Sequence, residues 1–112
     1  MQNLADLKRE AKLYAWEQVF NSWFPNGSLL IGQRREVSRV LSARLTLKTV
    51  MADGGYRESW LDFPKASEMV FADTYVKENG EKIEKEGAET LLIIEQEGGD
   101  KKHVMVYRLH RI

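Results

Sequence analysis

The feature that most constrains the fold is an unbroken apolar run, Leu-Leu-Ile-Ile, at positions 91–94. Successive side chains of a strand point to opposite faces of its sheet, so a strand without polar positions must be buried on both faces. We therefore expect residues 90–96 to form a strand at the centre of a sheet.

Turn signals divide much of the remaining chain into further strands. Glycine tolerates the positive φ that hairpin turns require, so Asp53-Gly54-Gly55 and Gly98-Gly99-Asp100 are predicted to be hairpin turns. Pro64 cannot donate to a ladder and is expected to end the strand before it. The expected strands are 29–32, 56–63, 69–77, 90–96 and 103–110, with one helical turn at 65–68.

Residues 37–50 are compatible with two structures. As a strand, this segment alternates Val37, Leu41, Ala43, Leu45 and Leu47 against a polar face. As a helix, it carries a passable apolar stripe that includes Val40. The length of the alternation and the frequency of valine and threonine favour the strand, and the helix stays open as the alternative.

Residues 3–22 are predicted to form one long helix. Asn3 can cap it, good helix formers dominate it, and the segment 25–27, Pro-Asn-Gly, would end it. In helical projection, however, the apolar stripe changes sides halfway along. Either the domain encloses the second half, or one stripe is left for a partner. The first stripe is Leu4, Leu7, Ala11, Tyr14 and Ala15, and the second is Leu13, Trp16, Phe20 and Trp23.

The polar segment 78–89 contains one large apolar side chain, Ile83, and is predicted to be a solvated loop or a short surface helix. Nothing repeats and no shift in composition marks a boundary, so residues 1–112 are expected to form a single domain. Hairpins favour antiparallel pairing, and the helix must cover a sheet face. The predicted fold is α+β, with an N-terminal helix packed on a five- or six-stranded, mainly antiparallel sheet or a half-open small barrel.

The chain has no cysteine and only two histidines, His103 and His110. The absence of cysteine excludes disulfides and fits a reducing compartment. No stretch approaches the roughly 18 apolar residues of a membrane span, and the N-terminal segment does not resemble a secretory signal, so we expect a cytoplasmic protein without a membrane partner. The odd separation of the histidines places them on opposite faces of a strand, and both are expected at surface or edge positions.

The charges balance at 17 basic and 17 acidic residues, but their distribution along the chain is uneven. Residues 34–52 hold five basic residues and one acidic residue, whereas residues 53–99 hold five basic and twelve acidic residues. This distribution fits a fold with one basic and one acidic face, or charges that simply solvate opposite sides.

No motif predicts catalysis. Neither glycine pair has the strand before it and the helix behind it that a phosphate-binding loop needs. The carboxylates in the middle of the chain show no pair spacing, and Glu58 and Asp62, which could share a strand face, give only a weak signal. We therefore expect a protein that is not an enzyme and that uses no cofactor or metal.

Protein association is the favoured function, because aromatic residues crowd the segment 16–24 and aromatic side chains dominate interfaces as well as cores. The partner would be a second copy of the chain or a factor that the protein binds and blocks, as small domains encoded by phages or mobile elements do. Core packing is the other explanation of the same aromatics. The expected partner-binding residues are Trp16, Phe20, Trp23, Arg34, Arg35 and Arg39.

Binding of single-stranded nucleic acid is the alternative function. Basic groups interleaved with aromatic side chains on a small antiparallel sheet can follow a phosphate backbone and stack bases. The zero net charge argues against this function. The residues that would serve it are Arg44, Lys48, Tyr56, Trp60, Lys101, Lys102 and Arg108, with Tyr107 as a further aromatic.

Overall fold

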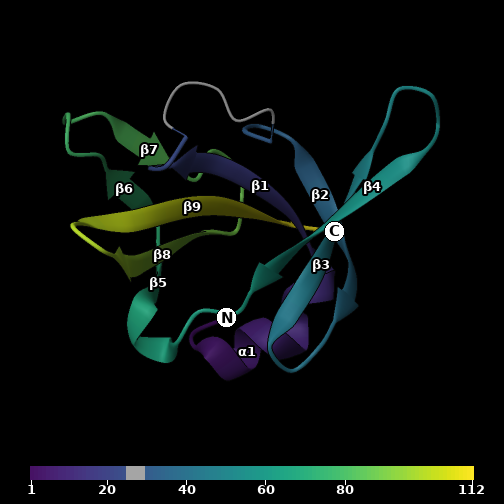
Figure 1. The fold of residues 1–112 in the computed structure, drawn as a ribbon, viewed down its shortest axis with the longest axis horizontal. Helices are drawn as coiled ribbons and strands as arrows, with labels where there is room; N and C mark the ends of the chain where they lie inside the picture. The colour runs from purple at the N-terminus through teal and green to yellow at the C-terminus, as the bar shows by residue number, and fades with distance from the viewer. Residues whose placement is uncertain (25–29) are drawn as a thin grey trace.

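A seven-stranded antiparallel sheet forms most of the protein in this computed structural model, which describes residues 1–24 and 30–112. Within these residues the strand order is β4-β3-β2-β1-β9-β8-β5, and a separate two-stranded sheet pairs β6 with β7 (Figure 1). The α+β class is confirmed, but the strands exceed the predicted five or six, and the sheet is not closed into a barrel. The strands are β1 (Tyr14–Asn21), β2 (Arg34–Val40), β3 (Arg44–Val50), β4 (Tyr56–Asp62), β5 (Met69–Ala72), β6 (Thr74–Val76), β7 (Lys82–Glu84), β8 (Thr90–Gly98) and β9 (Lys101–Arg111).

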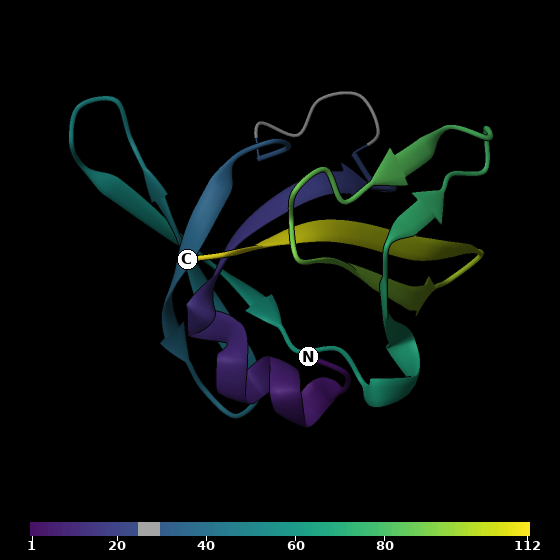
Figure 2. The same cartoon turned by 180° about the vertical axis from the view of Figure 1, so that it is seen from behind.

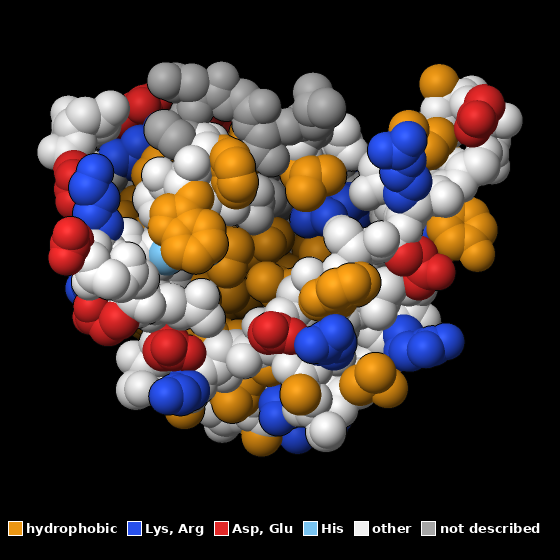
Figure 3. All heavy atoms as spheres, in the orientation of Figure 1, with side chains coloured by type: hydrophobic (Ala, Val, Ile, Leu, Met, Phe, Trp, Pro, Cys, Tyr) orange, Lys and Arg blue, Asp and Glu red, His pale blue; other side chains and the backbone are white. Residues whose placement is uncertain are grey.

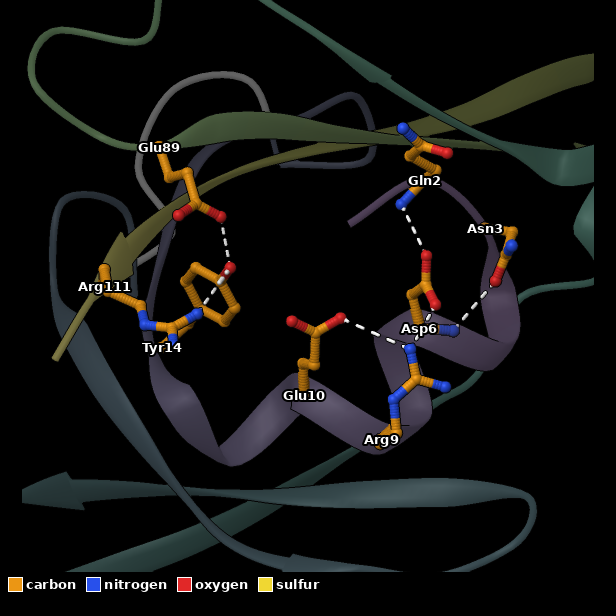
Figure 4. A network of polar contacts seen from close by, with 8 residues as sticks. All are labelled: Gln2, Asn3, Asp6, Arg9, Glu10, Tyr14, Glu89 and Arg111. Carbon is orange, nitrogen blue, oxygen red and sulfur yellow. Dashed lines mark hydrogen bonds and ion pairs between the residues drawn. The ribbon is translucent and has the colours of Figure 1, made fainter.

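A short helix, α1 (Leu4–Glu10), precedes the sheet and continues into a 3-10 turn, η1 (Ala11–Leu13). The Asn3 side-chain oxygen caps the helix by accepting a hydrogen bond from the backbone N–H of Asp6 at 2.9 Å (Figure 4). A carboxylate oxygen of Asp6 in turn accepts one from the backbone N–H of Gln2 at 2.9 Å. Leu7 and Ala11 are fully buried, so the helix packs against the core of the sheet.

The predicted helix over residues 3–22 is wrong beyond residue 13, because residues 14–21 form β1, the middle strand of the sheet. Tyr14, Trp16 and Gln18 are buried at alternate positions, which is the period of a strand. The apolar stripe changed sides in the helical projection because the second half of the segment follows the two-residue period of a strand. β1 pairs with β2 on one side and with β9 on the other, and this tertiary pairing overrides the helix propensity of the segment.

The start of β1 is tied to two segments that are distant in the sequence. The Tyr14 hydroxyl donates to the carboxylate of Glu89, just before β8, and accepts from Arg111 Nη1 at 3.3 Å (Figure 4). The backbone N–H of Glu89 also donates to the carbonyl oxygen of Leu109 at 2.9 Å. These contacts fix β1, β8 and β9 to one another near α1.

Segment 37–50 is extended, so the strand interpretation is confirmed over the helix. It is not one strand, however, because a turn at residues 41–43 separates β2 from β3, with the backbone N–H of Leu41 donating to the carbonyl oxygen of Arg44 at 2.8 Å. The strand predicted for 29–32 is also wrong, since residues 30–32 form a turn; residue 29 lies outside the described residues.

The two predicted hairpin turns are confirmed. Gly54 has a φ of +89° between β3 and β4, and Gly99 has a φ of +74° between β8 and β9. The predicted strand 56–63 corresponds to β4, and the helical turn at 65–68 to a 3-10 turn, η2 (Ala66–Glu68). Glycine is therefore used at both turns for the left-handed conformation that other residues rarely adopt.

The second half of the chain differs from prediction in three ways. The strand predicted for 69–77 is divided between β5 in the large sheet and β6 in the small one. The predicted loop 78–89 contains β7, whose buried Ile83 anchors it. β8 is buried on both faces as expected, but it lies next to the edge strand β5 instead of at the centre. The β6–β7 sheet covers the outer face of β8, since Leu91 and Ile93 pack with Ile83.

The seven-stranded sheet thus has an inner face and an outer face. The inner face carries the larger core, to which α1 contributes, and the outer face of β8 and β9 carries the smaller core beneath β6 and β7 (Figures 1 and 2). In the described part of the chain, no helix is long and apolar enough to span a membrane.

Candidate functional site

The inner face changes from apolar to polar with distance from α1. Near α1, the opposed residues Trp16 on β1 and Leu109 on β9 are both fully buried. Further along the same two strands, Gln18 lies opposite Tyr107, and Asn21 contacts His103. All four of these polar or partly polar side chains are buried. The polar end of the inner face is therefore the candidate site.

A cluster of four polar side chains, which we call the Arg35 cluster, lies at this end: Gln18, Arg35, Ser59 and Tyr107. Gln18 Nε2 donates to the Tyr107 hydroxyl oxygen at 2.9 Å, and Arg35 Nη1 donates to Ser59 Oγ at 2.9 Å. Strand alternation explains how the arginine reaches the interior. On β2, Arg35 and Val37 point inward, whereas their neighbours Arg34 and Glu36 are exposed.

Arg35 is a buried cation without a counter-ion among the described residues. Only 3% of its surface is exposed, no carboxylate lies within ion-pair distance, and its Nε has no hydrogen-bond partner in the described part of the chain. Burial lowers the pKa of the Arg35 guanidinium, and the nearby Tyr107 hydroxyl opposes this effect. A buried charge without a partner costs several kcal/mol of stability, so this arrangement requires an explanation.

Tyr107 completes the cluster with a hydroxyl that is poorly satisfied as a donor. Its burial raises the pKa of the Tyr107 hydroxyl, which therefore stays protonated, although Arg35 and Gln18 act in the opposite direction. The acceptor that this hydroxyl reaches is Met105 Sδ at 3.9 Å, and a thioether sulfur is a weak acceptor. Among the described residues, the Arg35 Nε and the Tyr107 hydroxyl are thus both hydrogen-bond donors without a strong acceptor.

The rim of the site is formed by His103, Asn21 and Trp23. His103 Nε2 lies 2.9 Å from Asn21 Oδ1, which also accepts a hydrogen bond from the backbone N–H of Trp23 at 3.0 Å. The indole of Trp23 stacks on the imidazole ring of His103, and 59% of Trp23 is exposed. Burial lowers the pKa of His103, which favours its neutral form.

Figure 3 shows that this face of the molecule is hollowed at its centre. Hydrophobic side chains form the bottom of the hollow, and basic atoms lie on its wall on the side of β2. The hollow is open to solvent while the cluster itself is buried, which is the arrangement of a site that a small molecule can enter.

A second hollow, of about 1070 Å³, lies on the other side of the sheet between the β8–β9 hairpin and β6, with Phe20 and Tyr75 in its lining. Two of its charged side chains have partners: Lys77 Nζ lies 3.0 Å from Glu81, and Lys102 Nζ lies 3.2 Å from Glu95. Its other charged side chains, Glu78, Asp100 and Lys101, are exposed to solvent, so this hollow lacks the buried unpaired charge that distinguishes the Arg35 cluster.

The outer face of β3 and β4 carries a different feature, an exposed pair of aromatic rings. Trp60 and Tyr56 are 67% and 57% exposed, and each is covered by a cation: Arg44 Cζ lies 5.3 Å from the Trp60 ring centroid, and Lys48 Nζ lies 4.4 Å from that of Tyr56. Asp62 lies 3.3 Å from Arg44 Nε. Basic and acidic groups alternate on this face, so it is not the purely basic face that the charge distribution allowed.

The structure does not bring the predicted partner-binding residues together on one surface. Trp16 is fully buried and donates from Nε1 to the carbonyl oxygen of Ala11 at 3.2 Å, so it is a core residue and not an exposed anchor. Arg35 is also buried, which removes it from that set. Phe20 is half-buried against Tyr75 on the outer side. Trp23, Arg34 and Arg39 are exposed.

The residues predicted for nucleic-acid binding are divided between two places. Arg44, Lys48, Tyr56 and Trp60 do lie together on the outer face of β3 and β4. Lys101 and Lys102 lie instead at the β8–β9 hairpin, and Arg108 contacts the carboxylates of Glu17 and Glu86. Tyr107 is buried. No continuous basic and aromatic surface joins the predicted residues.

The two histidines differ from prediction in their burial. They point to opposite faces of β9 as expected, but His103 and His110 are only 6% and 9% exposed, so neither is a surface residue. His110 Nε2 lies 2.7 Å from Glu17 Oε1. Among the described residues, no group of three histidine, aspartate or glutamate side chains could hold a metal ion.

Sequence reasoning missed the Arg35 cluster as a site. The sequence places Arg35 among the predicted partner-binding residues and predicts no role for Gln18 or Ser59. The available signal was the position of Arg35 two residues before Val37 in a segment of strand-like alternation, which places the arginine on the apolar side. Comparison of the chain with protein-family models, with curated proteins and with solved structures found no match.

Proposed function

We propose that the protein is a non-catalytic binding module that associates with a second copy of itself through strand β4. The observation that carries this proposal is the position of β4 at the end of the seven-stranded sheet, where its one pairing partner among the described strands is β3. The open side of an edge strand presents backbone donors and acceptors to another strand. Tyr56 and Trp60 add exposed aromatic surface beside that edge.

The charges of β4 restrict how two copies can pair. When two identical strands pair antiparallel about a twofold axis perpendicular to the sheet, each residue meets one on the same face. If the axis passes through Ser59, Glu58 lies opposite Trp60 of the other copy, and no like charges meet. A shift of one pair in either direction sets Glu58 against Glu58 or Asp62, and directly opposed like charges destabilise a sheet. The register centred on Ser59 is therefore favoured.

A matched pair of substitutions at Trp60 tests this register. Trp60→Glu places a second acidic group opposite Glu58, whereas Trp60→Lys places a basic group there. Trp60 is 67% exposed, so neither variant is expected to unfold. Sedimentation of the wild type and of the lysine variant should give a mass near twice 13.0 kDa, and the glutamate variant should give the monomer mass. A monomeric wild type, or equal masses for the two variants, would refute the proposal.

Single-stranded nucleic acid is a second candidate partner, supported by one observation. Arg44, Lys48, Tyr56 and Trp60 share the outer face of β3 and β4, where a base could stack. Glu58 and Asp62 on the same face oppose a phosphate backbone. Fluorescence anisotropy with a labelled oligothymidylate at low salt checks this function. Binding that weakens steeply as salt rises and disappears in Trp60→Ala would favour nucleic acid.

A further inference from the structure

We infer that the hollow at the polar end of the inner face binds a small amphiphilic monocarboxylate, with the carboxylate at the Arg35 cluster and the apolar body against Val37 and Met105. The carboxylate would bind on the inner face and the second copy along the open backbone edge of β4, and the two proposals share Ser59, whose side chain accepts from Arg35. They are tested by different measurements, a ligand titration and a mass, so their failures are distinguishable.

The Arg35 cluster has more donors than acceptors. Arg35 Nε has no hydrogen-bond partner in the described part of the chain, and the Tyr107 hydroxyl reaches the sulfur of Met105 at 3.9 Å as its acceptor. The Ser59 oxygen already accepts from Arg35 Nη1. A carboxylate supplies two oxygens and no hydrogen, so it can accept from both unsatisfied donors at once. A neutral alcohol or amide would accept fewer of these bonds.

The charge of the cluster points to a monoanion. The guanidinium of an arginine stays protonated in proteins, so Arg35 contributes one positive charge. The described residues provide no carboxylate to pair with it, and His103 at the rim favours its neutral form because burial lowers its pKa. One carboxylate would neutralise one guanidinium in the planar geometry that arginine favours. A dianion such as a phosphate monoester would leave an excess negative charge in a buried place.

The surroundings of the cluster require the rest of the ligand to be apolar. Val37 and Met105 keep 9% and 8% of their surface exposed, whereas Leu45 and Leu109, deeper in the same core, are fully buried. The bottom of the hollow is hydrophobic in Figure 3. Beside the cluster, the exposed indole of Trp23 stacks on His103, and it also lines the second hollow on the other side of the sheet. A hydrocarbon or aryl group on the carboxylate would bury this apolar surface.

Titration with three simple probes separates the contributions of charge and hydrocarbon. Sodium octanoate carries both, 1-octanol carries the hydrocarbon alone, and sodium acetate carries the charge alone. In a two-dimensional NMR titration of the whole chain, we expect octanoate to bind at least tenfold more tightly than either of the others. The largest shifts should come from residues around Arg35, Ser59 and Tyr107. Equal affinities for octanoate and octanol, or equal affinities for octanoate and acetate, would overturn the inference.

Substitution of neighbouring arginines provides a matched control. Arg35→Met removes the buried cation, and Arg34→Met removes an exposed cation from the opposite face of the same strand. The preference for octanoate over octanol should be lost in the first variant and kept in the second. A variant with methionine at position 35 that still prefers octanoate would rule out the assigned site.

Tyr107→Phe tests the hydroxyl without changing the volume of the core. Octanoate should then bind roughly three- to tenfold more weakly, as expected for the loss of one hydrogen bond. The affinity for octanol should not change, because the hydrocarbon contacts remain. An unchanged octanoate affinity in this variant would contradict the role assigned to Tyr107.

Discussion

The indole of Trp23 lies flat against the imidazole of His103, with ring centroids 3.6 Å apart and an angle of 9° between the planes. His103 is only 6% exposed whereas Trp23 is 59% exposed, so the tryptophan covers the ring face of the histidine on which it stacks. The histidine therefore reports on the packing of the rim of the hollow.

The stack predicts a lowered histidine pKa that depends on Trp23. Burial lowers the pKa of His103 below its ordinary value of 6.5, so the unfolded chain binds a proton more readily than the native protein just below that pH. Stability is then expected to fall as the pH decreases through this region. An NMR titration of the His103 ring should give a value below 6.5, and Trp23→Ala should raise it. A His103 pKa at or above 6.5 would contradict this account.

Trp16→Ala should destabilise the protein strongly. Trp16 is fully buried, contacts Tyr107 with ring centroids 5.5 Å apart, and donates to the Ala11 carbonyl. Its truncation is expected to cost about 3–5 kcal/mol in the free energy of unfolding, measured by urea denaturation. The control is Leu41→Ala at an exposed position between β2 and β3, where the expected change is within about 0.5 kcal/mol. Similar costs for the two variants would count against the core assignment of Trp16.

Arg35→Met should leave the unliganded protein as stable as the wild type, or more stable by about 1 kcal/mol. Replacing a buried ion by an apolar side chain of similar volume removes the cost of desolvation. Arg108→Met provides the contrast, because Arg108 is paired with Glu17 and Glu86 and donates to the carbonyl oxygen of Glu84. It should lose about 1 kcal/mol or more. Denaturant unfolding without added carboxylate measures the free energy of unfolding of both variants. A larger loss of stability for Arg35→Met than for Arg108→Met would disprove the idea that Arg35 is unpaired.

Gly54→Ala should weaken the β3–β4 hairpin. Gly54 has a φ of +89°, which costs an alanine about 1–2 kcal/mol, although no atom lies within 4 Å of the added Cβ. Gly55→Ala is the neighbouring control, because its φ is not in that region and its closest contact, at 3.1 Å, is the movable side chain of Asp53. Thermal unfolding should show the larger loss for Gly54.

The hairpins, the strand 103–110 and the α+β class could be predicted from the sequence, because each depends on local signals. Gly54 and Gly99 mark turns whatever surrounds them. The alternating pattern of side chains in the last strand can likewise be recognised without knowing which strands pair with it. β1 could not be predicted in this way, since its alanine, glutamate and glutamine favour a helix, and its pairing with β2 and β9 decides the outcome.

The candidate site was harder to predict than the fold. Arg35 is charged, and a charged side chain in an arginine-rich segment is normally exposed. Its burial depends on Ser59 and Tyr107, which come from strands 24 and 72 positions further along the chain. Likewise, β8 was placed at the sheet centre because the small sheet that covers it was hidden in a polar segment with one anchor, Ile83. Such arrangements depend on contacts between distant segments, which local patterns do not contain.

The central position of β1 has a consequence for how the chain acquires its structure. Its register with β9 joins Tyr14 to Arg111, and the hydrogen bond between their side chains closes a loop of 97 positions. During synthesis, residues 14–21 must wait for residues 101–111 to leave the ribosome before both of their sides are paired. We therefore expect folding to be slow, because it is limited by this long-range closure. Until β9 is available, the incomplete sheet must be protected from premature association.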